Sequence, residues 1–244
     1  MRQLPVIFKR ELGSYFATPL AFVFIEIFLV LSGVFTFYLG SFYERNQADL
    51  APFFDVHPWL YLFLLPALAM RLWSEERKSG SIELLMTLPV SCFEAVVGKF
   101  LAAWVVAGLT LLLTLPMVLT VNYLGNPDNG VILTGYLGSW LLAGTYLAIG
   151  SCMSAMAKSQ VVALILAFTV CFLFVACGFS LVLDAINPWA PQWLLDLLAS
   201  LSLLTHFAAI SKGLIDLRDP LYFLSVIVAW LMATVVTVNL KKAE

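Results

Sequence analysis

The sequence predicts an all-α, polytopic membrane protein with about six transmembrane helices in a single domain over residues 1–244. Three observations support this prediction: 62% of the 244 residues are hydrophobic, only 11% are charged, and long uncharged apolar runs recur along the chain. Soluble domains carry about 25% charged residues, and a membrane-spanning helix needs roughly 20 apolar residues. The net charge of −2 comes without a large basic cluster, so nothing indicates a nucleic-acid partner.

Residues 1–18 are predicted to form an interfacial helix rather than a span. An apolar stripe recurs at helical spacing and consists of Leu4, Phe8, Leu12 and Tyr15 or Phe16. Arg10 and Ser14 lie on another face, with Lys9 nearby. Such a helix lies in the plane of the membrane surface with its basic residues toward anionic headgroups. A frayed basic tail is the alternative. Pro19 marks the bend into the first span.

The candidate spans are apolar runs bounded by charges and by turn-forming residues. They cover residues 12–43, 56–73, 100–127, 129–157, 159–183 and 221–240. The first run is too long for the apolar region of a cleavable signal peptide, so it is expected to remain as a span. The segment GNPDNG, residues 125–130, is dense in turn formers and separates the third span from the fourth.

The Lys and Arg residues predict the orientation. With a cytoplasmic N-terminus, ten of the 13 basic residues lie in inner segments and three in outer segments. This bias follows the positive-inside rule, so both termini are expected in the cytoplasm.

The outer loop at residues 184–219 is predicted to hold a re-entrant or interfacial helix. Residues 197–211 contain only 15 uncharged residues, too few to cross the hydrocarbon comfortably. Trp189 and Trp193 are expected at the outer boundary, where tryptophan is enriched.

The inner loop at residues 74–98 is predicted to contain a short capped helix of about two turns. Gly80 releases the chain from the preceding helix, and Ser81 is a favourable N-cap. Glu83 complements the positive end of the helix dipole, and Pro89 disfavours helix at the residue before it. After the loop, a capping-box pattern begins at Ser91 and starts the third span.

The apolar face of this short helix consists of Ile82, Leu85 and Met86. A two-turn helix is not stable in water without a packing surface. The residues alone leave two surfaces open, a groove on a partner protein or the lipid bilayer.

The inner loop resembles the corresponding loop of the ABC-2 permeases, the membrane subunits of a large class of ATP-driven exporters. The resemblance rests on Glu75-Glu76-Arg77, Gly80-Ser81, Glu83-Leu84-Leu85, Pro89 and Gly98-Lys99. The family usually has Thr where this chain has Ser81. Further segments extend the likeness, which is greatest to the permease subunits of gliding-motility ABC transporters: RELGSYFATPLAF, APFFDVHPWLYLFLLPALAMRLWSEER, YLGNPDNG and HFAAISKGLIDLRDPLYFLS.

The resemblance implies that the short inner helix is a coupling helix seated on an ABC ATPase subunit. The residues implied in this coupling are Glu75, Glu76, Arg77, Gly80, Ser81, Ile82, Glu83, Leu85, Met86 and Pro89. It also implies two ATPase copies that bind ATP-Mg and a second permease subunit as homodimer or heterodimer. It is compatible with a periplasmic accessory protein as a further partner. The location implied is the bacterial inner membrane.

Two functions are compatible with these features. The first is a permease subunit that moves a substrate outward. The alternative is a mechanotransmitting or scaffolding subunit that passes ATPase motion to a periplasmic assembly without cargo flux.

The chain is not expected to be an enzyme. Gly98-Lys99 is followed by Phe100 and lacks the spacing of a phosphate-binding loop, and no H-E-x-x-H or G-x-S-x-G motif occurs. No catalytic residue, metal site or cofactor is therefore expected in this chain. His57 and His206 are expected at the outer membrane boundary, and the four cysteines are expected in apolar packing.

Glu26 is the one charge inside a predicted span. Because an unpaired carboxylate near mid-membrane is costly, Glu26 is expected in the translocation path or at the subunit interface. A protonated residue hydrogen-bonded within one bundle is the alternative.

Asp216, Arg218 and Asp219 lie just before the last predicted span. They form a candidate outer gate or a docking surface for a partner. Solvated charges with a local Asp–Arg pair are the alternative.

Overall fold

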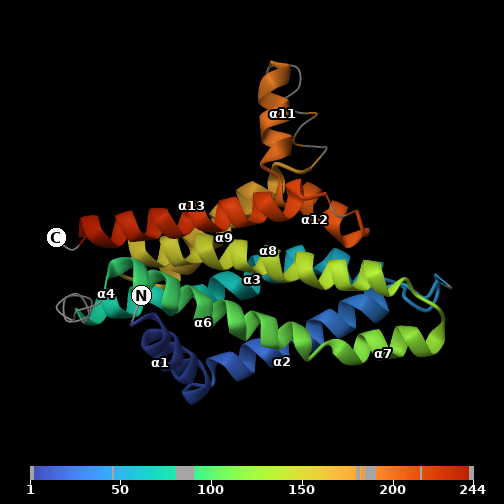
Figure 1. Cartoon of the computed structure of the whole chain (residues 1–244), viewed down its shortest axis with the longest axis horizontal. Coiled ribbons are helices and arrows are strands. Elements are labelled where there is room, and N and C mark those ends of the chain that lie inside the picture. The colour runs from blue at the N-terminus through green and yellow to red at the C-terminus, as the bar shows by residue number, and fades with distance from the viewer. Residues whose placement is uncertain are drawn as a thin grey trace.

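A computed structural model describes residues 3–45, 47–80, 91–179, 182, 184, 191–214 and 216–241. Over these ranges the chain forms helices and connecting turns, and no β-strand occurs in the part described. The long helices run side by side in one bundle (Figure 1). The all-α prediction is confirmed.

The helices in chain order are α1 (Leu4–Ala17), α2 (Leu20–Val34) with a π-helical turn η1 (Phe35–Leu39), α3 (Ala51–Ala69), α4 (Arg71–Ser79), α6 (Cys92–Leu112), α7 (Leu115–Leu124), α8 (Asn129–Met156), α9 (Gln160–Ala176), α11 (Gln192–Ser200), α12 (Leu203–Ser211) and α13 (Arg218–Leu240).

Among the described residues, five helical stretches, two of them interrupted by a turn, are long and apolar enough to cross a membrane. They are Leu20–Leu39, Ala51–Ser79, Cys92–Leu124, Asn129–Met156 and Arg218–Leu240. The fifth predicted span corresponds to α9, an apolar helix of 17 residues, or about 25 Å. The chain is a multi-pass membrane protein.

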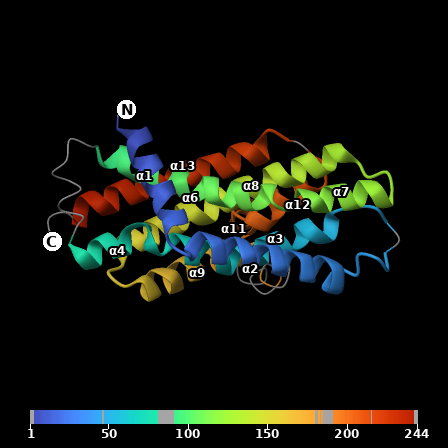
Figure 2. The ribbon, with the colours of Figure 1, turned by 90° about the horizontal axis from the view of Figure 1, so that it is seen from below.

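Successive long helices alternate in direction, so the bundle has two distinct ends (Figures 1 and 2). The α4 end carries α1, α4 and the described parts of both termini. The opposite end carries α7 and α12.

Helix α1 crosses the bundle at a steep angle instead of running along it (Figure 2). Its buried residues are Ile7 and Tyr15. Ile7 lies so close to Gly98 of α6 that a Cβ at residue 98 would be 2.9 Å from Ile7 Cγ2. The helix predicted within residues 1–18 is therefore present as α1, and it packs on the bundle through Tyr15 of the expected apolar stripe and through Ile7 outside it.

The third predicted span, whose apolar run covers residues 100–127, begins where its capping box predicted but differs from the structure in the middle and at its end. Helix α6 begins at Cys92, because Ser91 and Glu94 form the predicted capping box. The helix is then interrupted at Leu113 and Thr114 before α7 begins. Pro116 has no N–H to donate to Leu112, which accounts for the interruption.

The segment before the last span also differs from the prediction. The single helix expected at residues 197–211 is two helices, because Ser202 caps α12 by accepting a hydrogen bond from the Thr205 N–H at 3.2 Å. Helix α11 projects sideways from the bundle (Figure 1). Helix α13 begins at Arg218, so Arg218 and Asp219 belong to the helix and not to the loop before it.

The spanning stretches that are most buried inside the bundle are those with the lowest mean hydropathy. Of the five spanning stretches, Ala51–Ser79 and Asn129–Met156 have the lowest mean hydropathy and are the most buried. In a bilayer, interfaces between helices are enriched in small and weakly polar residues, since lipid already solvates the most apolar faces. Helices α3 and α8 therefore form the centre of the bundle.

His57 lies in this centre and not at the membrane boundary, so its predicted position is wrong. Its side chain is fully buried among the rings of Phe28, Phe53 and Tyr61. Its Nδ1 is 2.8 Å from Ser139 Oγ, which is also 2.7 Å from the Tyr61 hydroxyl. The aromatic neighbours that suggested a boundary enclose the imidazole instead.

Gly150 of α8 allows the closest approach to α3. A Cβ at this position would lie 2.5 Å from the Cβ of Ala69, so any side chain forces the two helices apart.

We predict that Gly150→Ala lowers the stability of the chain by about 1–2 kcal/mol, because overpacking outweighs the better helix propensity of Ala. Gly13→Ala is the matched control, since a Cβ on Gly13 meets nothing within 4 Å. Thermal unfolding in detergent measures both. A Gly150→Ala protein at least as stable as Gly13→Ala would contradict the close packing of α3 and α8.

Candidate functional site

The candidate site is the α4 end of the bundle, where α4 leads toward the predicted coupling helix. Residues 81–90, which include Ser81, Ile82, Glu83, Leu85, Met86 and Pro89, lie outside the described residues. The structure therefore describes how the chain enters and leaves that segment. Gly80 ends α4 as predicted, with a left-handed φ of 71°, a conformation that glycine adopts without strain.

The junction between α3 and α4 is fastened to α8 by one hydroxyl. Ser154 Oγ accepts hydrogen bonds from the backbone N–H groups of Trp73 and Ser74 at 3.0 and 3.1 Å. It donates to the Met70 carbonyl at 2.7 Å. Trp73 lies in the first turn of α4, where the backbone N–H groups lack a partner within the helix, so Ser154 supplies one in a buried position.

Trp73 strengthens the same attachment. Its indole N–H donates to Ser151 Oγ at 3.2 Å, one turn of α8 earlier, and its side chain is fully buried. The two serines therefore hold α4 on α8 through both the backbone and a large side chain.

Arg77 makes a third attachment to α8. It donates to the carbonyls of Ala155 and Met156 at 2.8 and 2.9 Å. These carbonyls lie at the C-terminal end of α8, where a cation also complements the helix dipole. Lys241 Nζ donates to the Met156 carbonyl at 3.2 Å and brings the end of α13 to the same point.

On its other side, α4 joins α1 and α6 through a buried ionic cluster. Lys99 of α6 is 3% exposed, and its Nζ lies 2.8 Å from Glu76 Oε1 and 3.4 Å from Glu11 Oε1. Arg10 Nη2 lies 2.7 Å from Glu11 Oε1 and 3.9 Å from Glu76 Oε1. The ammonium of Lys99 also lies 5.2 Å from the centre of the Trp73 ring. The two positive charges of this cluster thus offset its two negative charges, and the cluster connects α1, α4 and α6.

The electrostatics of this cluster favour the ionised state of Glu11. Burial alone raises the pKa of a carboxyl group, but the charges of Lys99 and Arg10 together hold the pKa of Glu11 below its usual value. Glu76 uses one oxygen for Lys99, and its other oxygen is buried without a hydrogen-bond partner.

The described coupling residues thus differ in what they contact. Glu76 and Arg77 contact other helices of this chain, whereas Glu75 is exposed and pairs with Arg71 at 3.1 Å. The partners of α4, namely Lys99, Glu11, Ser151 and Ser154, were not singled out from the sequence as its partners. A lysine in the second turn of an apolar helix is the one local signal that could have indicated the cluster.

Glu26 lies apart from this site, on the exposed face of α2. Its exposed neighbours on that helix are Val23, Ile27 and Val30. The carboxylate is therefore not buried within this chain.

The three residues of the predicted outer gate do not act together. Asp216 and Arg218 are exposed, and Arg218 Nε lies 3.8 Å from Asp216 Oδ2. This contact fits the alternative of a local Asp–Arg pair. Asp219 is buried, and its Oδ1 lies 2.6 Å from His206 Nδ1. The other ring nitrogen of His206 lies 3.0 Å from the Ser200 carbonyl, so this contact joins α11, α12 and α13.

No cluster of three or more His, Cys, Asp or Glu side chains suited to a metal ion occurs among the described residues. Of the four cysteines, Cys152 and Cys171 are buried, and Cys92 and Cys177 are half-buried.

Two comparisons with known proteins bear on this arrangement. The sequence model of a family described as ABC-2 family transporter protein matches residues 22–240. No match was found among curated proteins.

We predict that Lys99→Met costs up to about 3–5 kcal/mol of stability, because Glu11 and Glu76 lose the buried cation between them and keep only the half-exposed Arg10. Glu76→Gln in the same chain should recover part of this loss, and the double-mutant cycle should show a coupling of about 1–3 kcal/mol. Thermal or denaturant unfolding in detergent measures each variant.

Lys78→Met is the matched control, since Lys78 is an exposed lysine of α4. It should change stability by less than about 0.5 kcal/mol. Strictly additive effects of Lys99→Met and Glu76→Gln would contradict the cluster.

Proposed function

The chain belongs to the ABC-2 family of transporter proteins, and we propose that it is the membrane permease subunit of an ATP-driven ABC exporter. The observation that carries this proposal is the attachment of α4. The helix that leads into residues 81–90 is held on one side by α8 and on the other by α1 and α6. A force applied to the inner loop therefore reaches three other helices of the bundle.

A separate ATPase subunit would supply that force. The chain has no phosphate-binding loop of its own. In the proposed complex, two ATPase subunits bind ATP-Mg and close, and each pushes on the coupling helix of a permease subunit. A second permease subunit, either identical or related, completes the transmembrane path.

The path of the force follows from the contacts. Glu76 carries a displacement of α4 to α6 through Lys99, while Arg77 and Ser154 carry it to α8. Ion pairs buried away from water do not exchange for water contacts during such a movement. The α4 end therefore moves as a unit, and the bundle opens or closes toward its opposite end.

The distribution of basic residues supports a cytoplasmic position for the α4 end. Arg10, Arg71, Arg77 and Lys99 all lie there, with Lys241 of the last span. We place the chain in a bacterial inner membrane with both termini in the cytoplasm, as the positive-inside rule favours.

The mechanotransmitting alternative is favoured by one feature, helix α11. It projects sideways from the bundle (Figure 1), and Trp193 on it is exposed. A projecting helix with an exposed tryptophan suits contact with an accessory protein.

We predict that Leu85→Asp abolishes co-purification of the P-loop ATPase, because an unpaired charge in an apolar interface costs about 3 kcal/mol or more, a roughly 100-fold loss of affinity. Glu83→Lys should weaken it as well. Leu217→Asp, an exposed leucine just before the last span, should retain the ATPase.

Retention of the ATPase by Leu85→Asp would contradict the coupling role of residues 81–89. ATP-dependent cargo flux in proteoliposomes then separates the two functions. Flux that requires Leu85 supports the exporter, whereas ATPase binding without any flux supports the mechanotransmitting subunit.

The exposed position of Glu26 supports its proposed role at a subunit interface or path. A carboxylate facing lipid near mid-membrane costs about 2.5–3.5 kcal/mol by insertion measurements. We therefore infer that this face of α2 is covered by the second permease subunit or by the polar path between the two.

We predict that Glu26→Gln lowers cargo flux severalfold while the ATPase still co-purifies, because the side chain keeps its shape but loses its charge. Flux measured in proteoliposomes at equal protein content tests this. A Glu26→Leu variant that is more stable than the native chain and transports normally would contradict it, since that result is expected of a lipid-facing carboxylate.

A further inference from the structure

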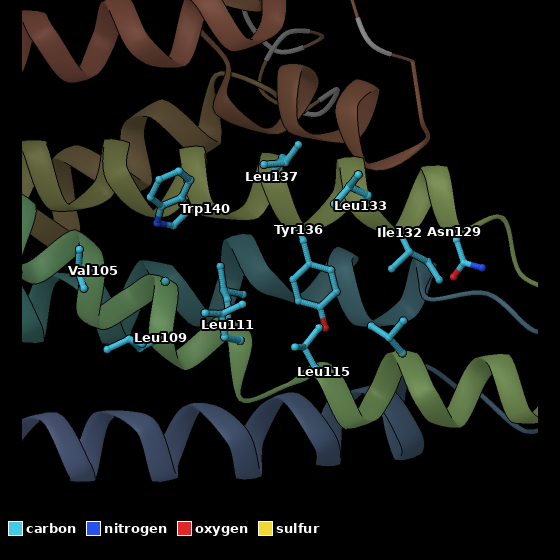
Figure 3. A pocket seen from close by; sticks show the side chains of 13 residues that line it. Val105, Leu109, Leu111, Leu115, Asn129, Ile132, Leu133, Tyr136, Leu137 and Trp140 are labelled. Atoms are coloured by element: carbon cyan, nitrogen blue, oxygen red, sulfur yellow. The ribbon is translucent and has the colours of Figure 1, made fainter.

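A long apolar groove lies between the broken third span and α8, with a cavity volume of about 540 Å³. Figure 3 shows its walls, with side chains of α6 and α7 facing those of α8. The lining residues are Val105, Gly108, Leu109, Leu111, Leu112, Leu115, Val118, Asn129, Ile132, Leu133, Tyr136, Leu137 and Trp140. No charged side chain is among them, so the groove suits a neutral, apolar occupant.

The break between α6 and α7 shapes this groove. Tyr136 of α8 reaches across to the break (Figure 3), where its hydroxyl lies 2.8 Å from Thr114 Oγ1 and 3.3 Å from the Thr114 carbonyl. Thr114 Oγ1 is also 2.6 Å from the Leu111 carbonyl. The Thr114 hydroxyl and the carbonyls of Leu111 and Thr114 are therefore hydrogen-bonded within the chain, and most of the lining side chains are apolar.

The groove is closed toward the α4 end. Trp140 stacks on Trp104 of α6 with ring centres 4.2 Å apart, and the Trp104 indole N–H donates to the Trp140 carbonyl at 2.8 Å. Because α6 and α8 touch here, another helix, about 10 Å wide, cannot enter between them. A narrower occupant is required.

The length of the groove matches one leaflet of a bilayer. Asn129 and Trp140 are eleven positions apart on α8, or about 16 Å along the helix. The hydrocarbon core is about 30 Å thick, so the groove extends from the membrane surface to near the midplane.

The mouth of the groove is polar, unlike its walls. Asn129 begins α8, and its amide exchanges hydrogen bonds with Asn122 of α7 at 3.0 and 3.1 Å. A lipid with its chain in the groove would have its glycerol region at this amide pair.

We propose that the groove binds one acyl chain of a phospholipid from the leaflet at the α7 end. Its closed inner end, apolar walls, polar mouth and one-leaflet length distinguish it from the exposed helix faces that bulk lipid covers. The site rests on the membrane placement of the chain and not on the direction of transport.

Photolabelling tests the site. The full-length chain is reconstituted in phosphatidylethanolamine and phosphatidylglycerol bilayers that contain a phospholipid with a diazirine in its acyl chain. Label is expected to concentrate on residues 105–118 and 129–140, severalfold above the exposed faces of α9 and α13. An even distribution over all exposed apolar helices would overturn the proposal.

A groove-filling substitution with a matched control sharpens the test. Leu109→Trp should reduce label on residues 129–140 severalfold, whereas Leu166→Trp on α9 should not; both leucines are 38% exposed. Leu133→Trp blocks the opposite wall and replaces Leu109→Trp should that variant fail to fold. Unchanged labelling in the groove-filling variant, or a groove without label in the native chain, would overturn the site.

Discussion

The ammonium of Lys99, almost fully removed from solvent between Glu76 of α4 and Glu11 of α1, joins three helices at one end of the bundle. Removing one member of such a buried pair costs about 3–5 kcal/mol, because the remaining charge has no water to solvate it. The interhelical hydrogen bonds between α4 and α8 are individually weaker, at about 0.6 kcal/mol on average in membranes. The ionic cluster is therefore the contact that most strongly prevents α4 from moving alone.

The hydrogen bonds to α8 add less stabilising free energy than the ionic cluster, but they fix the position of α4 on its other side. Ser151, Ser154 and the terminal carbonyls of α8 hold α4 from the side opposite the cluster. A helix held on both sides cannot slide past its neighbours, so a push from the inner loop is distributed to α6 and α8 together. The chain belongs to the ABC-2 family, so the proposed source of this push is a separate ATPase subunit.

The bundle itself is adapted to lipid on the outside and to close helix contacts within. Gly150 allows α8 to approach α3, and Ser139 forms hydrogen bonds with His57 Nδ1 and with the Tyr61 hydroxyl in the interior. At the break between α6 and α7, the hydroxyls of Tyr136 and Thr114 bond to each other, so these two polar groups are satisfied within the chain. The groove beside this break has room for an acyl chain of a phospholipid.

The amino-acid sequence by itself determined the properties that depend on neighbours along the chain. The lengths of the apolar runs predicted the spans, the Ser91–Glu94 pattern predicted the start of α6, and Gly80 predicted the end of α4. The break at Leu113–Thr114 and the early start of α13 were missed. Pro116 lay inside a long apolar run, and Arg218 and Asp219 looked like solvated loop charges although Asp219 is buried against His206.

Only the tertiary structure decided which distant residues meet. Lys99 could face any of several carboxylates, and nothing local to it names Glu11 or Glu76. The aromatic residues near His57 in the sequence predicted a position at the membrane boundary, although His57 lies in the core. The physical reason is that burial and ion pairing depend on how helices far apart in the sequence approach one another, while capping, helix breaking and span length depend on adjacent residues.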